Sequence, residues 1–349
     1  HLDQVDFAGH HEGGPQSPNW DAAAVRADNM LGHILAELDL SKDTIVVLSD
    51  HVQIDAGGHG GQDSVCLLEP FIIAGAGVNP GQYADMQMVD VAPTLSALMG
   101  INLPASTQGE VKTAMLALPQ SVTENLPDAV KAQQSALLMT YASAFNKQST
   151  ALKMLESTQV SDYQAVIHSL RTQMLFSDRI KRALPTALLL AVAITLLIRQ
   201  RKNGSLAWLL GGLGFLLLFN LRYAVIDQKV FSLSIITSEI ELIIYVAVTA
   251  AISLVIVWLL VNLFKKTFAG SASVNGLKTL YLGFTVVFIA GLPVLASYLI
   301  NGPVVSWTLP DYLTSFLALL GLIQVLVVSA LTPLLAGLTA LITKLNRKG

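Results

Sequence analysis

The residues best suited to chemistry lie in two short clusters. Asp6 and His10 are four residues apart in "DFAGH", and Asp50, His51 and His59 belong to the glycine-rich stretch "SDHVQIDAGGHGG". Carboxylates and imidazoles together suit zinc, manganese or iron, and one ion needs about three such ligands when a position stays open for substrate. Five ligands are enough to begin two metal sites, and the glycines allow close backbone approach.

The elements that must position these clusters alternate as in an α/β domain. Apolar runs rich in β-branched residues predict buried strands at residues 44–50 and 70–78. Apolar residues at helical spacing predict helices at residues 19–38 and 88–100. This order favours a mostly parallel sheet flanked by helices.

Both clusters are expected at one edge of that sheet. We interpret "HLDQVDFAGHHEGG" as the end of a strand that enters a loop, and the second cluster follows the strand "TIVVL" directly. Functional groups in such sheets collect at the carboxyl ends of strands. Asp55 and Asp63 are expected to be turn formers, and His33 and His168 to be structural or surface residues. The chain begins with His and has no signal sequence, so we expect a fragment that lacks its N-terminal part.

The second half of the chain has the composition of a membrane protein. Hydrophobic residues make up 53% and charged residues 13% of the chain, against about 25% charged in a typical soluble protein. Residues 111–182 are predicted to be an amphipathic helical stalk, either packed on the preceding domain or lying at the membrane surface. The predicted domains are therefore 1–110, 111–182 and 183–349, the last being a transmembrane bundle. Its apolar stretches are residues 183–198, 205–226, 240–264, 277–300 and 312–342.

Basic residues predict the orientation of these spans. One set of loops carries Arg199, Arg201, Lys202, Lys265, Lys266, Lys278, Lys344, Arg347 and Lys348. The opposite loops carry only Arg222 and Lys229, apart from Arg179, Lys181 and Arg182 before the first span. By the positive-inside rule the first set is cytoplasmic, as is the C-terminus, and everything before residue 183 is extracytoplasmic. A net charge of −3 gives no indication of nucleic-acid binding.

Three motifs in order resemble the alkaline phosphatase superfamily. They are "HLDQVDFAGHHEG" at residues 1–13, "VVLSDHVQIDAGGHGG" at 46–61 and "VDVAPTLSALMGINLP" at 89–104. The resemblance is to the type I phosphodiesterase branch, and in particular to the membrane-embedded ethanolamine phosphate transferases of glycolipid anchor synthesis. It implies that residues 1–110 form the C-terminal part of an alkaline-phosphatase-like domain with two divalent metal ions, zinc being expected and manganese the alternative.

The same resemblance implies a division of the ligands. Asp6, His10 and His59 would hold one ion, whereas Asp50 and His51 would hold the other together with residues upstream of the chain. One of those would be the Ser or Thr nucleophile, which forms a covalent phospho-enzyme before transfer to water or an alcohol.

Three further residues bear on substrate binding and on the match to the family. His1 is a candidate substrate-binding residue. Val52 and Gln53 depart from the family's pattern after the Asp-His pair, which leaves an inactive variant as an alternative.

The predicted function is a membrane-anchored, metal-dependent phosphodiesterase or phosphoethanolamine-type transferase that acts on a lipid or lipid-linked phosphodiester. A sulfatase-like hydrolase is the nearest enzymatic alternative, but three histidines suit poorly the calcium that such enzymes bind. A non-catalytic membrane scaffold with a vestigial phosphatase-like domain is the alternative from another class. The fragment alone is expected to be inactive because it lacks the nucleophile.

Overall fold

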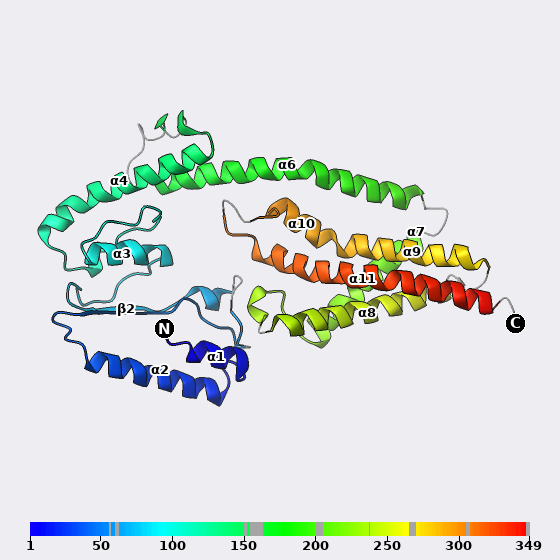
Figure 1. Ribbon diagram of the computed structural model, residues 1–349, viewed down its shortest axis with the longest axis horizontal. Helices are drawn as coiled ribbons and strands as arrows, with labels where there is room; N and C mark the ends of the chain where they lie inside the picture. The colour runs from blue at the N-terminus through cyan, green and yellow to red at the C-terminus, as the bar shows by residue number, and fades with distance from the viewer. Residues whose placement is uncertain are drawn as a thin grey trace. The chain divides into compact units, whose positions relative to one another are not determined.

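Helices make up most of the described part of the chain (Figure 1). The computed structural model describes residues 1–55, 57–59, 63–149, 152–153, 163–199, 205–236, 238–264, 270–304 and 308–346. The chain divides into two compact units: residues 1–27, 51–68 and 179–349 form the first, and residues 28–50 and 69–178 form the second.

The two predicted strands are present, but they pair antiparallel. In the described residues the sheet consists of β1 (Thr44–Leu48) and β2 (Phe71–Gly75), with Val46 opposite Ile73. The prediction of a mostly parallel sheet is not met by this pair. A parallel pair needs a crossover connection, which is usually a helix. The described part of the connection from β1 to β2 contains only the short 3₁₀ helix η1 (Ser64–Leu67), so the chain simply returns along the sheet.

The N-terminal residues form a helix and not the end of a strand. Helix α1 spans Gln4–His11, with Asp6 in its first turn and histidines in its last turn. These positions complement the helix dipole, which favours an acidic group at the start and a basic group at the end. The prediction that these residues form the end of a strand is therefore wrong. The next predicted helix is confirmed as α2, which spans Pro18–Ala36.

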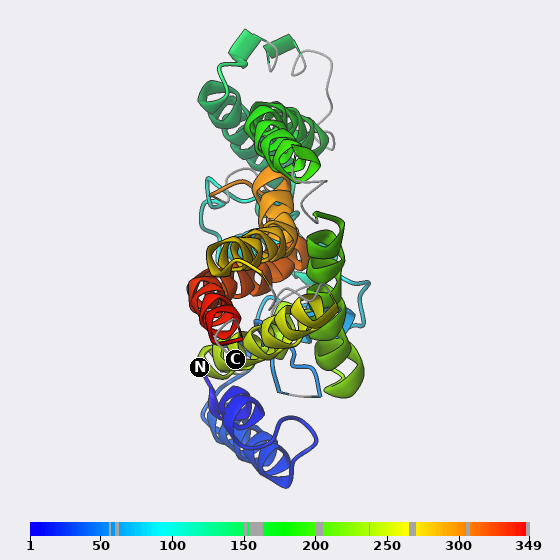
Figure 2. The same ribbon diagram turned by 90° about the vertical axis from the view of Figure 1, so that its right-hand side faces the viewer.

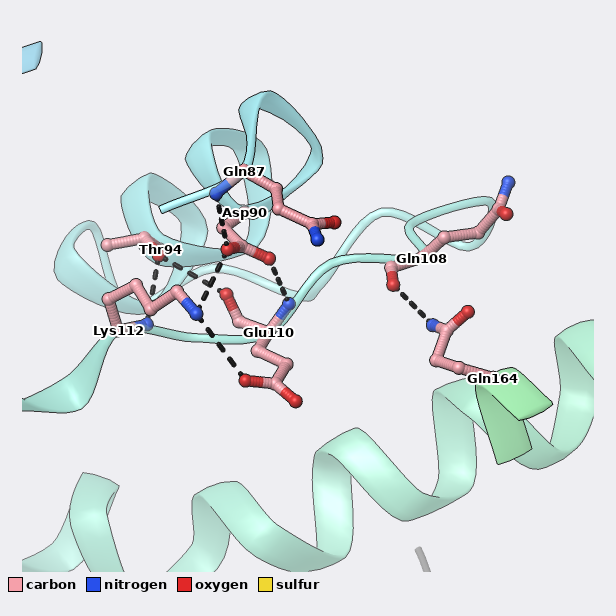
Figure 3. A network of polar contacts seen from close by, with 7 residues as sticks. All are labelled: Gln87, Asp90, Thr94, Gln108, Glu110, Lys112 and Gln164. Atoms are coloured by element: carbon pink, nitrogen blue, oxygen red, sulfur yellow. Dashed lines mark hydrogen bonds and ion pairs between the residues drawn. The ribbon is translucent and has the colours of Figure 1, made fainter. Parts of the chain in front are cut away.

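A buried carboxylate, Asp90, organises the segment around α3 (Val91–Leu98) in the second unit. The 3₁₀ helix η2 (Met88–Asp90) leads into α3, and η3 (Thr113–Met115) follows. Asp90 is 4% exposed and accepts hydrogen bonds from the backbone N–H groups of Gln87 (3.0 Å) and Glu110 (2.7 Å), as Figure 3 shows. Lys112 Nζ lies 3.0 Å from the same carboxylate. The segment after α3 is thus tied to the start of that helix.

The amphipathic face predicted for the stalk is buried within the second unit. Helix α4 spans Gln120–Ala144, and α6 spans Tyr163–Arg199. The Arg171 side chain of α6 donates to the Tyr141 hydroxyl of α4 and to Gln108 Oε1 at 2.8 Å. The apolar residues Tyr163, Val166, Ile167 and Leu170 are at most 8% exposed. The helix therefore packs on protein here, and it continues without a break past residue 183.

Five helices are long and apolar enough to cross a membrane, in agreement with the five predicted stretches. The first is α6. Helix α7 (Ser205–Asn220) continues into a π-helical turn, η6 (Leu221–Ile226), and the short 3₁₀ helix η7 (Leu233–Ile235) precedes α8. The remaining helices are α8 (Glu239–Phe264), α9 (Ala272–Ala290), α10 (Leu292–Ile300) and α11 (Tyr312–Leu345). Gly291 and Pro293 separate α9 from α10 within one predicted span.

Helices α9 and α11 lie side by side in the apolar bundle (Figure 2). Their interface contains small and polar residues. Thr279 and Thr339 have their hydroxyl oxygens 3.0 Å apart, and Trp258 of α8 donates to Thr339 at 2.9 Å. Such interactions are typical of membrane helices, where hydrogen bonds and close packing replace the hydrophobic effect. Of the predicted cytoplasmic basic residues, Arg201, Lys202, Lys265, Lys266, Arg347 and Lys348 lie outside the described residues.

Candidate metal centre

Helix α1 places one carboxylate and one imidazole on the same face. Asp6 and His10 are one helical turn apart, a spacing at which side chains meet. The Nε2 atom of His10 lies 3.5 Å from Asp6 Oδ1. The side chains are 18% exposed for His10 and 42% exposed for Asp6, so the pair is accessible to a small ligand.

The loop after β1 brings two further histidines to the same carboxylate oxygen. His51 Nε2 lies 3.8 Å and His59 Nε2 lies 3.7 Å from Asp6 Oδ1. The two imidazole rings stack with their centroids 3.6 Å apart. The His10 ring meets the His59 ring edge-on at 5.0 Å. Three imidazoles from two separate segments therefore converge on one oxygen atom.

The donor set fits a transition-metal ion. One ligand atom from each of Asp6, His10 and His59 lies within 4.8 Å of the others. Four ligands at about 2.1 Å around a tetrahedral zinc ion stand roughly 3.4 Å from one another. The observed separations of 3.5 and 3.7 Å between Asp6 and these histidines are close to that value. Nitrogen and carboxylate donors suit zinc or manganese better than calcium.

The other two predicted site residues, Asp50 and His1, are both exposed. Asp50 comes directly before His51, is exposed, and belongs to the second unit, whereas His51 belongs to the first. His1 is exposed and precedes α1. The roles of Asp50 as a metal ligand and of His1 as a substrate-binding residue stay predictions.

The connection between β1 and β2, called the His59 loop from here on, comes very close to the backbone of α1 at Gly57. This residue has φ +90°, and a Cβ atom built there would lie 1.8 Å from the carbonyl oxygen of Gly9 in α1. A tight turn leads to this contact, since Gly57 N–H donates to Ile54 O at 2.7 Å and Ile54 N–H donates to Gly58 O at 2.9 Å. The loop therefore lies against the backbone of α1, and this close approach sets His59 beside Asp6.

Gln53 binds the central carboxylate. Its Nε2 atom donates to Asp6 Oδ1 at 2.9 Å and approaches the backbone oxygen of Asp6 at 3.2 Å. The Trp20 indole donates to Gln53 Oε1 at 3.2 Å. In the sequence, Gln53 is notable only as a departure from a family pattern. The contact with Asp6 joins residues 47 positions apart, so local spacing in the sequence does not show it.

Asp63 ties the His59 loop to the membrane helices. Its carboxylate accepts hydrogen bonds from the hydroxyl groups of Ser232 and Ser234, which lie between α7 and α8. These two hydrogen bonds, Ser232 first, lower the pKa of Asp63 below its ordinary value, although partial burial opposes them. Its side chain makes no cap hydrogen bond to η1. The expected role of Asp63 as a simple turn former therefore misses its main contacts.

Comparisons with known proteins agree with the motifs. Residues 1–151 match the family model "Type I phosphodiesterase / nucleotide pyrophosphatase". Similar curated proteins are named GPI ethanolamine phosphate transferase 2. The one from Candida albicans is 26% identical over 129 residues, which are 33% of this chain and 14% of the relative. The one from Schizosaccharomyces pombe is 28% identical over 200 residues, 50% of this chain and 25% of the relative.

A third relative with the same name, from Yarrowia lipolytica, is 28% identical over 137 residues, 34% of this chain and 16% of the relative. The matched segments thus span a quarter or less of the lengths of these relatives. No solved structure matches the chain.

Proposed function

Because this chain is related to the alkaline phosphatase superfamily through its type I phosphodiesterase branch, we propose that it is part of a membrane-embedded, metal-dependent enzyme that transfers or hydrolyses a phosphoester on a lipid-linked substrate. Transfer of a phosphoethanolamine-type group is the preferred reaction, since all three relatives are named for it. The observation that carries the proposal is the convergence of three histidines on Asp6.

The metal-binding residues are assigned in two groups. Asp6, His10 and His59 hold one divalent ion, which we propose to be zinc, with manganese as the alternative. Asp50 and His51 contribute to a second ion. When bound, such ions lower the pKa of an attacking hydroxyl and stabilise charge on phosphoryl oxygens. The nucleophile of the proposed reaction is a Ser or Thr hydroxyl, and His1 is proposed to face the substrate.

The membrane part supports a lipid-borne substrate. Five helices are suited to crossing the bilayer, and the contact of Asp63 with Ser232 and Ser234 joins the His59 loop to the segment between α7 and α8. The positive-inside rule assigns that segment to the extracytoplasmic side. The proposed arrangement therefore has the catalytic part outside the cytoplasm, beside the membrane surface from which a lipid headgroup is reached, and a cytoplasmic C-terminus.

A pair of histidine variants tests the proposal. In the complete protein, His59→Ala should lose one metal ion per molecule, measured by elemental analysis, and most phosphodiesterase or transferase activity. His33→Ala is the matched control, because His33 lies exposed in the last turn of α2 and is not one of the three histidines that converge on Asp6. It should keep both properties. Full activity in His59→Ala would refute the site assignment.

Metal binding and activity of the wild-type protein distinguish the proposed enzyme from the scaffold alternative. A wild-type protein that binds no divalent ion and has no activity on phosphodiesters would indicate a non-catalytic scaffold. Metal binding at the assigned residues, with activity, excludes that alternative.

A further inference from the structure

The side chain of Gln53 connects the candidate metal centre to α2. Its amide lies between the indole of Trp20 and the carboxylate of Asp6, with hydrogen bonds of 3.2 and 2.9 Å. The same Nε2 atom lies 3.2 Å from the backbone oxygen of Asp6. One amide group thus contacts both the side chain and the main chain of a single proposed ligand.

The indole fixes which way the amide points. An indole N–H donates hydrogen bonds and accepts none, so the atom of Gln53 that faces Trp20 must be the oxygen. The NH₂ group is then directed at Asp6, where it meets two acceptors. A chain of hydrogen bonds therefore runs in one direction, from Trp20 through Gln53 to Asp6.

The backbone of α1 makes room for this amide. Gly9 is buried, and a Cβ atom built there would lie 2.1 Å from Gln53 Oε1 and 2.3 Å from Nε2. Any side chain larger than hydrogen at this position would displace the amide from Asp6. The absence of a side chain at residue 9 and the amide at residue 53 are two parts of the same contact.

We propose that Gln53 is a positioning residue that holds the Asp6 carboxylate in the orientation required for metal binding. The inference rests on the proposed function, because it assumes that Asp6 is a metal ligand. A carboxylate has about four lone-pair sites, so an oxygen that accepts one hydrogen bond can still bind an ion. Partners of this kind orient the ligand before the metal arrives, and their loss typically weakens metal binding by about 10- to 100-fold.

Zinc affinity of the purified chain, measured by competition with a chromophoric chelator, tests the inference. Gln53→Ala should bind zinc about 10- to 100-fold more weakly than the wild type. Gln53→Met should behave similarly with almost unchanged volume, since it keeps an unbranched side chain of similar length and removes the donor to Asp6. Gln4→Ala is the matched control: Gln4 is a glutamine of α1 whose Oε1 accepts from Arg26 at 3.0 Å. Its zinc affinity should stay within about twofold of the wild type.

The Co²⁺ spectrum, the unfolding temperature and a variant of Gly9 separate a positioning role of Gln53 from a structural one. The visible absorption of bound Co²⁺ reports the ligand geometry, and it should change in Gln53→Met while the unfolding temperature of the metal-free protein stays the same. Gly9→Ala should reproduce the weaker zinc binding, because it pushes the same amide away.

Each possible result decides the inference. Wild-type affinity and an unchanged Co²⁺ spectrum in both Gln53 variants would overturn the inference and leave the proposed function standing. A wild-type chain that binds neither zinc nor Co²⁺ would overturn both. If Gln53→Ala does not fold, Gln53→Met and Gly9→Ala decide between these outcomes.

Discussion

Replacing Gly57 by alanine should detach the His59 loop from α1. A Cβ atom at residue 57 would lie 1.8 Å from the carbonyl oxygen and 2.7 Å from the carbonyl carbon of Gly9, and contacts under 3.0 Å essentially do not occur. Both partners are backbone atoms, so no side chain can rotate away. The loop must retreat by the difference between 1.8 and 3.0 Å, about 1.2 Å.

A shift of this size is large compared with the tolerance of a metal site. Metal–ligand distances vary by only about 0.2 Å from their usual values. His59 is two residues beyond Gly57 and should no longer reach an ion held by Asp6 and His10. We expect zinc affinity to fall by at least tenfold, about 1.4 kcal/mol. The positive φ of +90° adds a folding cost of roughly 1–2 kcal/mol.

Two other glycines provide controls for this prediction. Gly100 has φ +66° with nothing within 4 Å of a built Cβ atom, so Gly100→Ala carries the backbone strain without a clash. Gly32 lies in α2 with open space around it and should tolerate alanine or gain slightly in helix stability. Zinc titration and thermal unfolding of the three variants separate strain from displacement. If Gly57→Ala binds zinc as tightly as Gly100→Ala does, the close approach of the loop to α1 is not what positions His59.

Three further predictions concern parts of the chain outside the metal cluster. Burial raises the pKa of Asp90, but hydrogen bonds from the backbone N–H groups of Glu110 and Gln87 and from Lys112 together outweigh it and hold this pKa below its ordinary value of 3.8. The contribution of the ionised Asp90 to the free energy of unfolding is therefore complete above pH 3.8 and is lost as the pH falls through the lowered pKa. Asp90→Asn should lower the unfolding temperature at neutral pH, and the difference in unfolding temperature between variant and wild type should narrow in acid. Asp63→Asn should loosen the His59 loop, seen as faster proteolysis between β1 and β2 without loss of the helical circular dichroism signal; an unchanged cleavage rate would contradict this. Gly283→Ala would place a Cβ atom 2.1 Å from the side chain of Thr332 and should destabilise the α9–α11 contact by about 1–3 kcal/mol in unfolding measurements, whereas Gly337→Ala meets nothing within 4 Å and should not.

Features set by local sequence patterns were predictable, and those set by distant partners were not. The helix α2, the two strands and the five apolar spans follow from spacing and composition within each segment. The direction in which β1 and β2 pair depends instead on the connection between them. Helix α1 resembles a strand end in the sequence, because a short segment with few apolar residues carries little periodicity.

The candidate site shows the same division. His51 and His59 stand out because ionisable ligands beside glycines at a strand end are unusual, and Asp6 and His10 because they are four residues apart. The structure brings these four together. The residues that bind or hold this cluster do not stand out in the sequence in this way. The amide of Gln53 contacts Asp6 across 47 positions, and Asp63 contacts Ser232 across 169. Nothing in the types of these residues indicates such contacts, since glutamine, aspartate and serine are common in loops.

Two of the basic residues that oppose the positive-inside rule contact the end of α10. Arg179 donates through Nε to the carbonyl oxygen of Ile300 at 3.1 Å, and Arg182 donates to that of Tyr298 at 3.0 Å. These carbonyls belong to the last turn of α10, where a helix leaves acceptors unpaired and its dipole attracts cations.

Arg179 and Arg182 are therefore needed where the fold places them, whichever side of the membrane that is. They weigh less as topology signals than basic residues without such partners. With these two set aside, the count of basic residues supports more strongly the proposal of a cytoplasmic C-terminus and an extracytoplasmic segment between α7 and α8, the segment whose Ser232 and Ser234 donate to Asp63.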